Sequence, residues 1–264
     1  VEKLGYKPYI INFDPFPPLD SITRYRTQAF MDFRQDYLNL TPLYTSSSFL
    51  NETNDYIDSF IVGSDQVWRK TITKNNLKTY FLDFVNWNKN CISYGASYGT
   101  NKFEGNYNEI NDCKLLLKKF SNVSVREKDA INITKELFDA NSCLVLDPTL
   151  LLTKEDYNTL ILKENVTNKK GHIAIYTLFD QDENFNKELK RLFPNKEILN
   201  IKTHSEYIPL LDRKELVYNS IPNWINEIKN ADYIVTDSYH GLLFSLIFEK
   251  DFICLGKNSS AKSR

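Results

Sequence analysis

The sequence has few of the features that mark a redox, metal-binding or membrane protein. Its 264 residues include four cysteines, none of which forms a CxxC pair or stands near a histidine at metal-ligand spacing. Cys91, Cys143 and Cys254 lie in apolar runs, and we expect all four to be buried free thiols in a reducing compartment. No apolar run is long enough to cross a bilayer, and no segment resembles a signal peptide. We therefore expect a cytoplasmic protein, with at most peripheral contact at the inner face of the membrane through a lipid-linked substrate.

The sequence also has no excess of charge of one sign. The 33 Lys and Arg residues nearly balance the 34 Asp and Glu residues, for a net charge of -1. Such a chain has no general attraction for nucleic acid or for an anionic membrane. There is no Walker loop, GxGxxG fingerprint, internal repeat or low-complexity segment. We expect no nucleic-acid partner, and any anion site must be built locally.

Short apolar runs alternate with helical patterns, which is typical of βα units around a parallel sheet. A polar segment rich in Lys and Asn divides this pattern at 153–171. The sequence predicts an α/β fold with two doubly wound halves, residues 1–152 and 172–264, joined by a linker at 153–171. The expected strands are 8–13, 58–68, 91–99, 123–127, 143–152, 172–179, 196–201, 232–238 and 252–256. The expected helices are 22–40, 109–120, 128–140 and 240–250, one that carries Phe185, Leu189 and Leu192, and one that Pro222 opens.

Two of the predicted strands end in runs of small and polar residues. Ligands of open α/β sheets bind beyond the carboxyl ends of strands, so these ends are candidate sites. In GSDQVW (63–68), small residues would let backbone amides approach a ligand, and Asp65 adds a carboxylate. The alternative is that Ser64 or Asp65 only caps the next turn. In SYGASYG (93–99), the spacing of Gly and Ser could form an anion-accepting loop.

Two further strand ends carry charge. In SVRE (124–127), Arg126 could hold a carboxylate or phosphate through two parallel hydrogen bonds. The alternative is a surface pair of Arg126 with Glu127. Asp147, followed by Pro148, is interpreted most simply as a strand stop with a turn.

The last candidate segment is TDSYHG (236–241), between an apolar strand and an apolar helix. His240 stands in the first turn of that helix, where amide groups and the helix dipole favour anions. A histidine can also give or take a proton near neutral pH. The alternative is a capping Asp or Ser beside a packed histidine. His172 and His204 have no such setting.

Taken together, GSDQVW, SYGASYG, SVRE, DPTLLL and TDSYHGLLFSLIF resemble the polysaccharide pyruvyl transferase family in content, order and spacing. The resemblance covers nearly the whole chain. It implies two Rossmann-like halves that face a cleft, as in two-domain glycosyltransferases of the GT-B type. Family members have an earlier strand before the position of VEKLGY and further helices after the position of Arg264, so we expect both terminal parts to be missing here.

The resemblance also implies a reaction. The family forms pyruvate ketals on bacterial cell-wall and capsule sugars and on some yeast glycans, with phosphoenolpyruvate as donor and no metal or other cofactor. The family's SVRE arginine matches Arg126, and its histidine at the last helix start matches His240. Better-known members read Arg-Leu-His there, so Ser238 replaces a donor-binding arginine. Either Lys257 or Arg264 supplies the missing cation, or this branch uses another donor or reaction.

These considerations give each candidate residue a role. His240 is the expected general acid, and Asp65 is the expected base for the acceptor hydroxyl. Two alternatives remain open: a glycosyltransferase that uses a nucleotide-sugar, and a non-catalytic carbohydrate-binding protein. The expected donor-binding residues are Arg126, Ser238, Tyr239 and Gly241, and the expected acceptor-binding residues are Ser64, Trp68 and Ser97, with Trp68 as a stacking platform.

Overall fold

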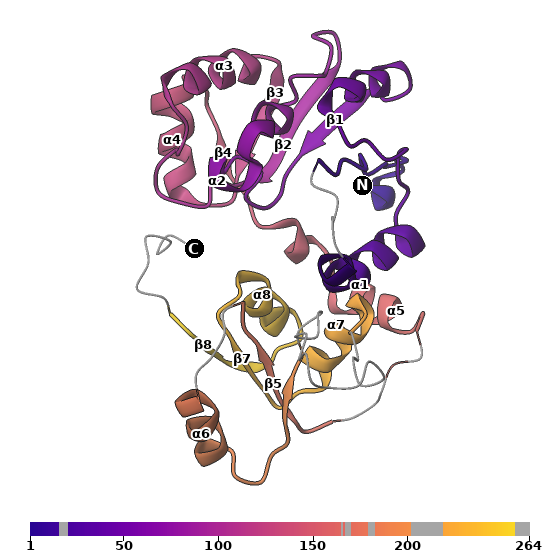
Figure 1. Cartoon of the computed structure of the whole chain (residues 1–264), viewed down its shortest axis with the longest axis vertical. Coiled ribbons are helices and arrows are strands. Elements are labelled where there is room, and N and C mark those ends of the chain that lie inside the picture. The colour runs from indigo at the N-terminus through magenta and orange to yellow at the C-terminus, as the bar shows by residue number, and fades with distance from the viewer. Residues whose placement is uncertain (16–20, 165, 167–169, 179–182, 202–218, 257–264) are drawn as a thin grey trace. The chain divides into compact units, whose positions relative to one another are not determined.

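A computed structural model describes residues 1–15, 21–164, 166, 170–178, 183–201 and 219–256 of the chain. These residues form two four-stranded sheets, both all-parallel and flanked by helices (Figure 1). The α/β class and the two Rossmann-like halves predicted from the sequence are therefore confirmed. None of the helices described has the length and the apolar character needed to span a bilayer.

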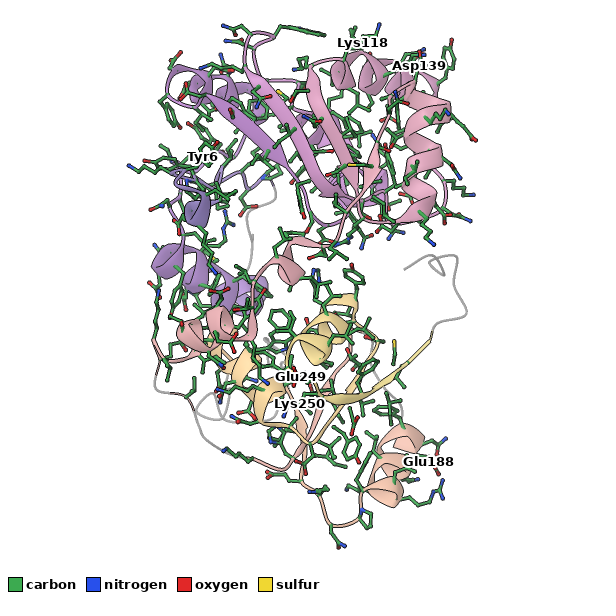
Figure 2. The ribbon with its side chains drawn as sticks, turned by 180° about the vertical axis from the view of Figure 1, so that it is seen from behind. Tyr6, Lys118, Asp139, Glu188, Glu249 and Lys250 are labelled. Carbon is green, nitrogen blue, oxygen red and sulfur yellow. The ribbon has the colours of Figure 1, made fainter. Side chains whose placement is uncertain are left out.

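The first sheet has its strands in chain order, β1-β2-β3-β4. α3 connects β2 to β3, and α4 connects β3 to β4. α3 packs against α4, and Lys114 Nζ lies 3.4 Å from Asp139 Oδ2 near the ends of the two helices. Figure 2 shows Lys118 and Asp139 at these helix ends. The elements are β1 (Ser59–Val62), α2 (Lys70–Thr73), β2 (Asn90–Ala96), α3 (Tyr107–Leu117), β3 (Phe120–Val125), α4 (Lys128–Phe138) and β4 (Cys143–Leu144), with 3-10 turns at Ser47–Asp55, Lys74–Asn76, Lys78–Phe81 and Pro148–Leu151.

An aromatic cluster fills the core beside this first sheet. Trp68 is 0% exposed and stacks on Phe81, with ring centroids 4.9 Å apart. Tyr98 lies 5.3 Å from Trp68 and stacks on Phe138 at 5.9 Å. The indole Nε1 of Trp68 donates to the carbonyl oxygen of Tyr80 at 2.9 Å, which satisfies its polar atom inside the core.

The second sheet has the order β6-β5-β7-β8. The chain runs from β5 to β6 on one side and then returns to β7 on the other side of β5. The connection therefore reverses between β5 and β7, which makes this point a topological switch point. The elements are β5 (Ile173–Tyr176), α6 (Glu183–Leu192), β6 (Ile198–Asn200), α7 (Ile221–Asn230), β7 (Tyr233–Thr236), α8 (Tyr239–Ile247) and β8 (Asp251–Cys254).

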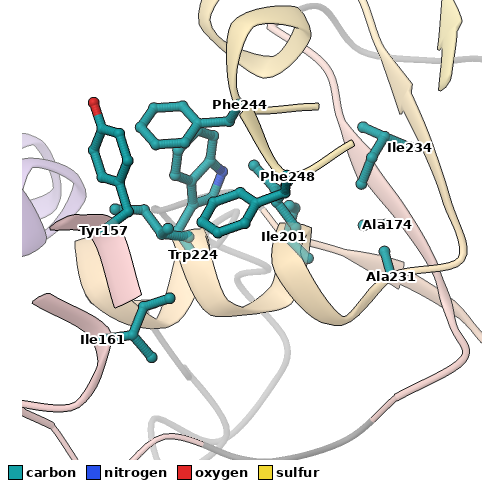
Figure 3. Packing of buried hydrophobic residues seen from close by; sticks show 11 residues of the cluster. Tyr157, Ile161, Ala174, Ile201, Trp224, Ala231, Ile234, Phe244 and Phe248 are labelled. Atoms are coloured by element: carbon teal, nitrogen blue, oxygen red, sulfur yellow. The ribbon is translucent and has the colours of Figure 1, made fainter. Parts of the chain in front are cut away.

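Helices cover both faces of the second sheet. Leu189 of α6 packs with Ile173, Ile175 and Val235 on one face. Trp224 of α7 and Phe244 of α8 pack on the other face, with centroids 5.0 Å apart (Figure 3). Because neighbouring residues of a strand point to opposite faces, a strand buried on both sides is a continuous apolar run, and this is why the sequence pattern located these strands.

A helix forms within the predicted linker 153–171. α5 (Lys154–Ile161) begins at a capping box, in which the Thr153 side chain accepts from the amide of Asp156 and the Asp156 side chain accepts from the amide of Thr153. Tyr157 and Ile161 are buried with Trp224 and Phe244 (Figure 3). The described part of 153–171 is thus not only a connection, because its apolar positions complete the core of the second sheet.

The chain divides into two compact units. The β1–β4 unit contains the described residues within 12–17 and 42–151, and the β5–β8 unit contains those within 1–11, 18–41 and 152–257. The N-terminal part of the chain therefore groups differently from the expected boundary at 1–152. Contacts with the second sheet's helices explain why residues 18–41 group with this unit. α1 (Ser21–Tyr37) packs on α7, and the hydroxyl of Tyr37 donates to Glu164 Oε1 at 3.2 Å.

The prediction of a strand at 8–13 is wrong. Only single bridges form there, Ile10 with Leu40 and Phe13 with Tyr44. The bridge partners, Leu40 and Tyr44, lie outside both sheets, so the segment is not extended into a ladder. β4 is likewise two residues long rather than spanning 143–152.

Two of the four cysteines are exposed, contrary to expectation. Cys91 and Cys113 are buried, but Cys143 and Cys254 lie exposed on β4 and β8, the last strands of their sheets. Burial raises the pKa of the Cys91 thiol and raises that of Cys113 to about 12. A thiolate-selective reagent at pH 8 should therefore label Cys143 and Cys254 in the native protein, and Cys91 and Cys113 only after unfolding.

Labelling with Ellman's reagent, with and without denaturant, checks this result. A double variant, Cys143→Ser with Cys254→Ser, provides the control and should give no native labelling. Rapid native labelling of Cys113 would contradict the packing of α3.

Candidate active site

Polar side chains gather around Arg126 at the carboxyl end of the first sheet. Arg126 follows β3, and its side chain is 2% exposed. Its Nη1 donates to Asp147 Oδ2 at 2.7 Å, its Nη2 to Asp65 Oδ1 at 2.8 Å and its Nε to Glu127 Oε1 at 3.3 Å. Residues that follow three different strands therefore supply carboxylates to one guanidinium group. Arg126 and Asp65, which were expected to bind the donor and the acceptor, are thus in direct contact.

Asp147 is the buried anchor of this group. Its Oδ1 accepts from the amide and hydroxyl of Thr149 at 3.0 and 2.7 Å, and its Oδ2 also accepts from the Ser64 hydroxyl at 3.3 Å. Burial alone would raise the pKa of Asp147, but hydrogen bonds from Thr149 and Arg126 outweigh it and lower the pKa. Asp147 therefore does more than end a strand, because its carboxylate binds Arg126, Thr149 and Ser64. The sequence did not predict these contacts.

Asp65 is the exposed carboxylate of the group. Its side chain is 62% exposed, against 0% for Asp147 and 9% for Glu127. Its backbone is left-handed, at φ 69°, and its carbonyl oxygen accepts from the amide of Ser97 at 3.0 Å. This bond fastens the loop after β1 to the chain that follows β2.

The glycines of this region bring strand ends together. Gly63 has φ 113°, and a Cβ there would clash with the carbonyl oxygen of Tyr94. Gly95 has φ 60° and faces the Cβ atoms of Ser64 and Arg126. The small residues of GSDQVW and SYGASYG therefore allow two chain segments to approach each other, and this is why Asp65 reaches Arg126.

Two of the expected acceptor-binding residues are core residues. Trp68 is fully buried in the aromatic cluster, so its ring offers no face on which a sugar could stack. Ser97 is 0% exposed; its hydroxyl donates to Glu127 Oε1 at 2.6 Å and accepts from the amide of Gly99 at 2.9 Å. Ser97 therefore holds Glu127, which the sequence had suggested as a surface partner of Arg126. Of the three expected residues, Ser64 is the one that is partly exposed beside Asp65.

The second group of candidate residues lies at the start of α8, next to the switch point between β5 and β7. The Ser238 side chain caps α8 by accepting from the amide of Gly241 at 3.3 Å. The amide of Ser238 donates to the hydroxyl of Thr236 at 3.0 Å, and that hydroxyl donates to the carbonyl oxygen of Tyr176 at 2.6 Å. The interpretation of Ser238 as a helix cap is thus confirmed. A Cβ at Gly241 would clash with Thr236, so only glycine lets α8 start this close to β7.

His240 and Tyr239 are the half-buried first residues of α8. Their rings meet edge to face, with centroids 5.4 Å apart. The ring of Tyr176, from β5, lies close to Gly241 at the start of α8. Burial and, after it, the charge of Asp237 raise the pKa of the Tyr176 phenol. Reasoning from sequence missed Tyr176, because its place beside Ser238 depends on the pairing of β5 with β7.

The other expectations concern single residues. His172 is 1% exposed, and its Nε2 lies 3.1 Å from the carbonyl oxygen of Glu227, which fits a packed histidine. His204, Lys257 and Arg264 lie outside the described residues. Within the described ranges, no group of three or more His, Cys, Asp or Glu is placed to hold a metal ion.

Comparison with known proteins matches the chain to a protein family. The family model described as "Polysaccharide pyruvyl transferase" matches residues 1–259. A search of curated proteins finds no significant match. Since the family match covers the segments that form both groups of candidate residues, the chain belongs to the polysaccharide pyruvyl transferase family.

Proposed function

We propose that the protein transfers the pyruvyl group of phosphoenolpyruvate to two hydroxyls of a sugar and so forms a pyruvate ketal. The sugar belongs to a cell-surface polysaccharide or to its lipid-linked precursor. The observation that carries this proposal is the place of His240 in the first turn of α8, next to a topological switch point. Family membership supports the general activity.

The reaction needs an acid at the donor and an acceptor of protons at the sugar. His240, as imidazolium, gives a proton to the methylene carbon of phosphoenolpyruvate, which becomes the methyl group. One sugar hydroxyl adds to the neighbouring carbon and loses its proton. The carbon–oxygen bond to phosphate then breaks, the second hydroxyl adds, and its proton leaves. The two hydroxyls lose one proton each. One of these protons replaces the proton that the carbon gained, and the leaving phosphate takes up the other.

The start of α8 is the assigned donor site. The first amides of a helix have no partner within the helix, and the helix dipole is positive there. We assign Ser238, Tyr239, His240 and Gly241, which form this helix start, to the donor's phosphate or carboxylate. The ring of Tyr176 lies beside this start, and we assign its phenol as a further hydrogen-bond donor.

The surroundings of Arg126 argue against its expected role as a donor ligand. One guanidinium already faces three carboxylates, of which two are buried. At an effective dielectric constant of about 20, each further like-charge pair about 5 Å apart costs roughly 3 kcal/mol. A phosphate there would meet at least two such pairs. We therefore assign Asp65, with Ser64, to the acceptor hydroxyls, which are neutral and donate hydrogen bonds.

Ligand-induced stabilisation tests the donor. Phosphoenolpyruvate at about 100 times its Kd should stabilise the folded protein by about 2.7 kcal/mol. For a chain of this size, that corresponds to a rise in Tm of roughly 5–10 °C. The measurement is a thermal shift with phosphoenolpyruvate, UDP and GDP in parallel, followed by phosphate release in the presence of a panel of hexosides and N-acetylhexosaminides. Stabilisation by a nucleoside diphosphate alone would point instead to a glycosyltransferase, and sugar binding without phosphate release to a carbohydrate-binding protein.

A further inference from the structure

Asp237 is the carboxylate of the segment 236–241 that the helix cap leaves unused. The sequence left open whether an Asp or a Ser caps the helix, and Ser238 does so. Oδ1 of Asp237 accepts instead from the amide of Leu178 at 2.6 Å. Leu178 follows β5 and Asp237 follows β7, the two strands between which the chain reverses. The carboxylate of Asp237 therefore lies at the switch point itself.

One oxygen of this carboxylate is fixed and the other is available. Asp237 is half-buried, and in the part of the chain that the structure describes its Oδ2 has no hydrogen-bond partner. The carboxylate is close enough to Tyr176 for its charge to raise the pKa of the phenol. Since the ring of Tyr176 lies close to Gly241, the carboxylate stands near the start of α8, to which we assign the donor.

We infer that Asp237 is a second proton acceptor of the reaction and takes the proton of the hydroxyl that closes the ketal. This inference rests on the proposed function, in which two hydroxyls lose a proton each, whereas the carboxylate of Asp65 takes up one at a time. In the closing step, the second hydroxyl oxygen bonds to the carbon that phosphate has left, and its O–H bond breaks. The proton passes to Oδ2 of Asp237 and from there to the phosphate, which leaves as hydrogen phosphate.

The charge of Asp237 suits the closing step and not the binding of the donor. When the bond to phosphate breaks, positive charge develops on the carbon and on the oxygen of the first sugar hydroxyl. A carboxylate that is already fixed nearby stabilises this charge without reorganisation. The same carboxylate repels intact phosphoenolpyruvate, which carries a phosphate and a carboxylate. Loss of its charge should therefore slow the closing step without weakening donor binding.

The variant Asp237→Asn tests the inference. Its amide oxygen can still accept from Leu178, but the side chain has lost the charge and takes up no proton. We expect the rate of ketal formation to fall at least about 10²-fold, which is the lower end of the usual contribution of a general base. The Kd for phosphoenolpyruvate should stay within about twofold of wild type or decrease. Water should add to the carbon in place of the second hydroxyl, which yields free pyruvate and the unchanged sugar.

Three products are measured in parallel: phosphate by its release, pyruvate with lactate dehydrogenase, and the ketal by mass spectrometry. Asp232→Asn is the matched control, because Asp232 precedes β7 at the opposite end of the strand and pairs with Lys196. It should change none of the three yields. Asp237→Glu keeps a proton acceptor on a longer side chain and should form more ketal per phosphate released than Asp237→Asn.

The outcomes are distinct. Circular dichroism checks each fold, and Asp237→Ser replaces Asp237→Asn, with the same expected products, should the latter not fold. Normal ketal formation in the folded variant overturns the inference, and so does a tenfold rise in the Kd for phosphoenolpyruvate, which would make Asp237 a donor ligand. If ketal and phosphate fall together and no pyruvate forms, Asp237 acts before phosphate leaves, and its assignment to the closing step is wrong. In each of these cases the proposed function stands. It falls, and the inference with it, if the wild-type protein releases no phosphate from phosphoenolpyruvate.

Discussion

Replacing His240 with glutamine should lower kcat for pyruvyl transfer by about 10²- to 10⁴-fold, which is the usual contribution of a positioned general acid. Glutamine keeps a polar side chain of similar reach but cannot deliver a proton to carbon. The amides at the start of α8 remain in place, since Ser238 caps the helix through its own side chain. Affinity for phosphoenolpyruvate should therefore change little. Steady-state kinetics with saturating acceptor, together with a thermal shift by the donor, measures the two quantities separately.

His172 provides the matched control for His240. It is a second histidine of the same unit. His172 is buried, contacts the carbonyl oxygen of Glu227, and stands before β5 in the chain rather than at the start of α8. His172→Gln should lower the free energy of unfolding, because it alters a buried polar contact, yet leave kcat per folded molecule unchanged. Near-normal turnover in His240→Gln would remove His240 from the reaction.

Trp68→Ala should lower the free energy of unfolding by about 3–5 kcal/mol, the usual cost of emptying a large aromatic site in a core. The indole is fully buried, stacks on Phe81 and lies beside Tyr98, so its removal leaves a cavity between these two rings. Trp68→Phe keeps most of this packing but loses the hydrogen bond to the Tyr80 carbonyl group. It should cost less, about 1–3 kcal/mol. Urea unfolding followed by circular dichroism measures both values.

Trp87 is the control for this second result. It is 62% exposed, and its ring lies 5.8 Å from Lys119 Nζ. Trp87→Ala should change the free energy of unfolding by less than about 1 kcal/mol, because a largely exposed ring and one cation–π contact are lost. A Trp68→Phe protein of normal stability that lost its affinity for sugars would contradict the burial of Trp68 and restore the stacking role expected from the sequence.

Prediction of the fold from sequence succeeded where the pattern of apolar residues is local and repeated. The apolar runs at 172–179 and 232–238 became β5 and β7, and Pro222 stands in the first turn of α7 as expected. It failed at 8–13, which has the pattern of a strand but no consecutive partner. It also missed α5, because the Lys- and Asn-rich composition of 153–171 concealed two apolar positions, Tyr157 and Ile161, one helical turn apart.

The candidate site shows the same division at the level of single residues. Asp65 and Arg126 were expected from strand ends and do meet, at 2.8 Å. Trp68 and Ser97 came from the same strand-end segments and are buried instead. Asp147 was expected only as a strand stop and Tyr176 was not singled out, since their roles depend on which strands lie side by side.

The sequence by itself determined the α/β class, the strand ends that carry polar residues and the family to which the chain belongs. These properties follow from the periodicity of apolar residues and from short motifs, which need no knowledge of distant contacts. Only the tertiary structure decided that Arg126 is shared by three carboxylates, that Trp68 belongs to the core and that Asp65 is the exposed end of the network. Burial and charge balance depend on residues distant along the chain, and parallel strand pairing is what brings those residues together.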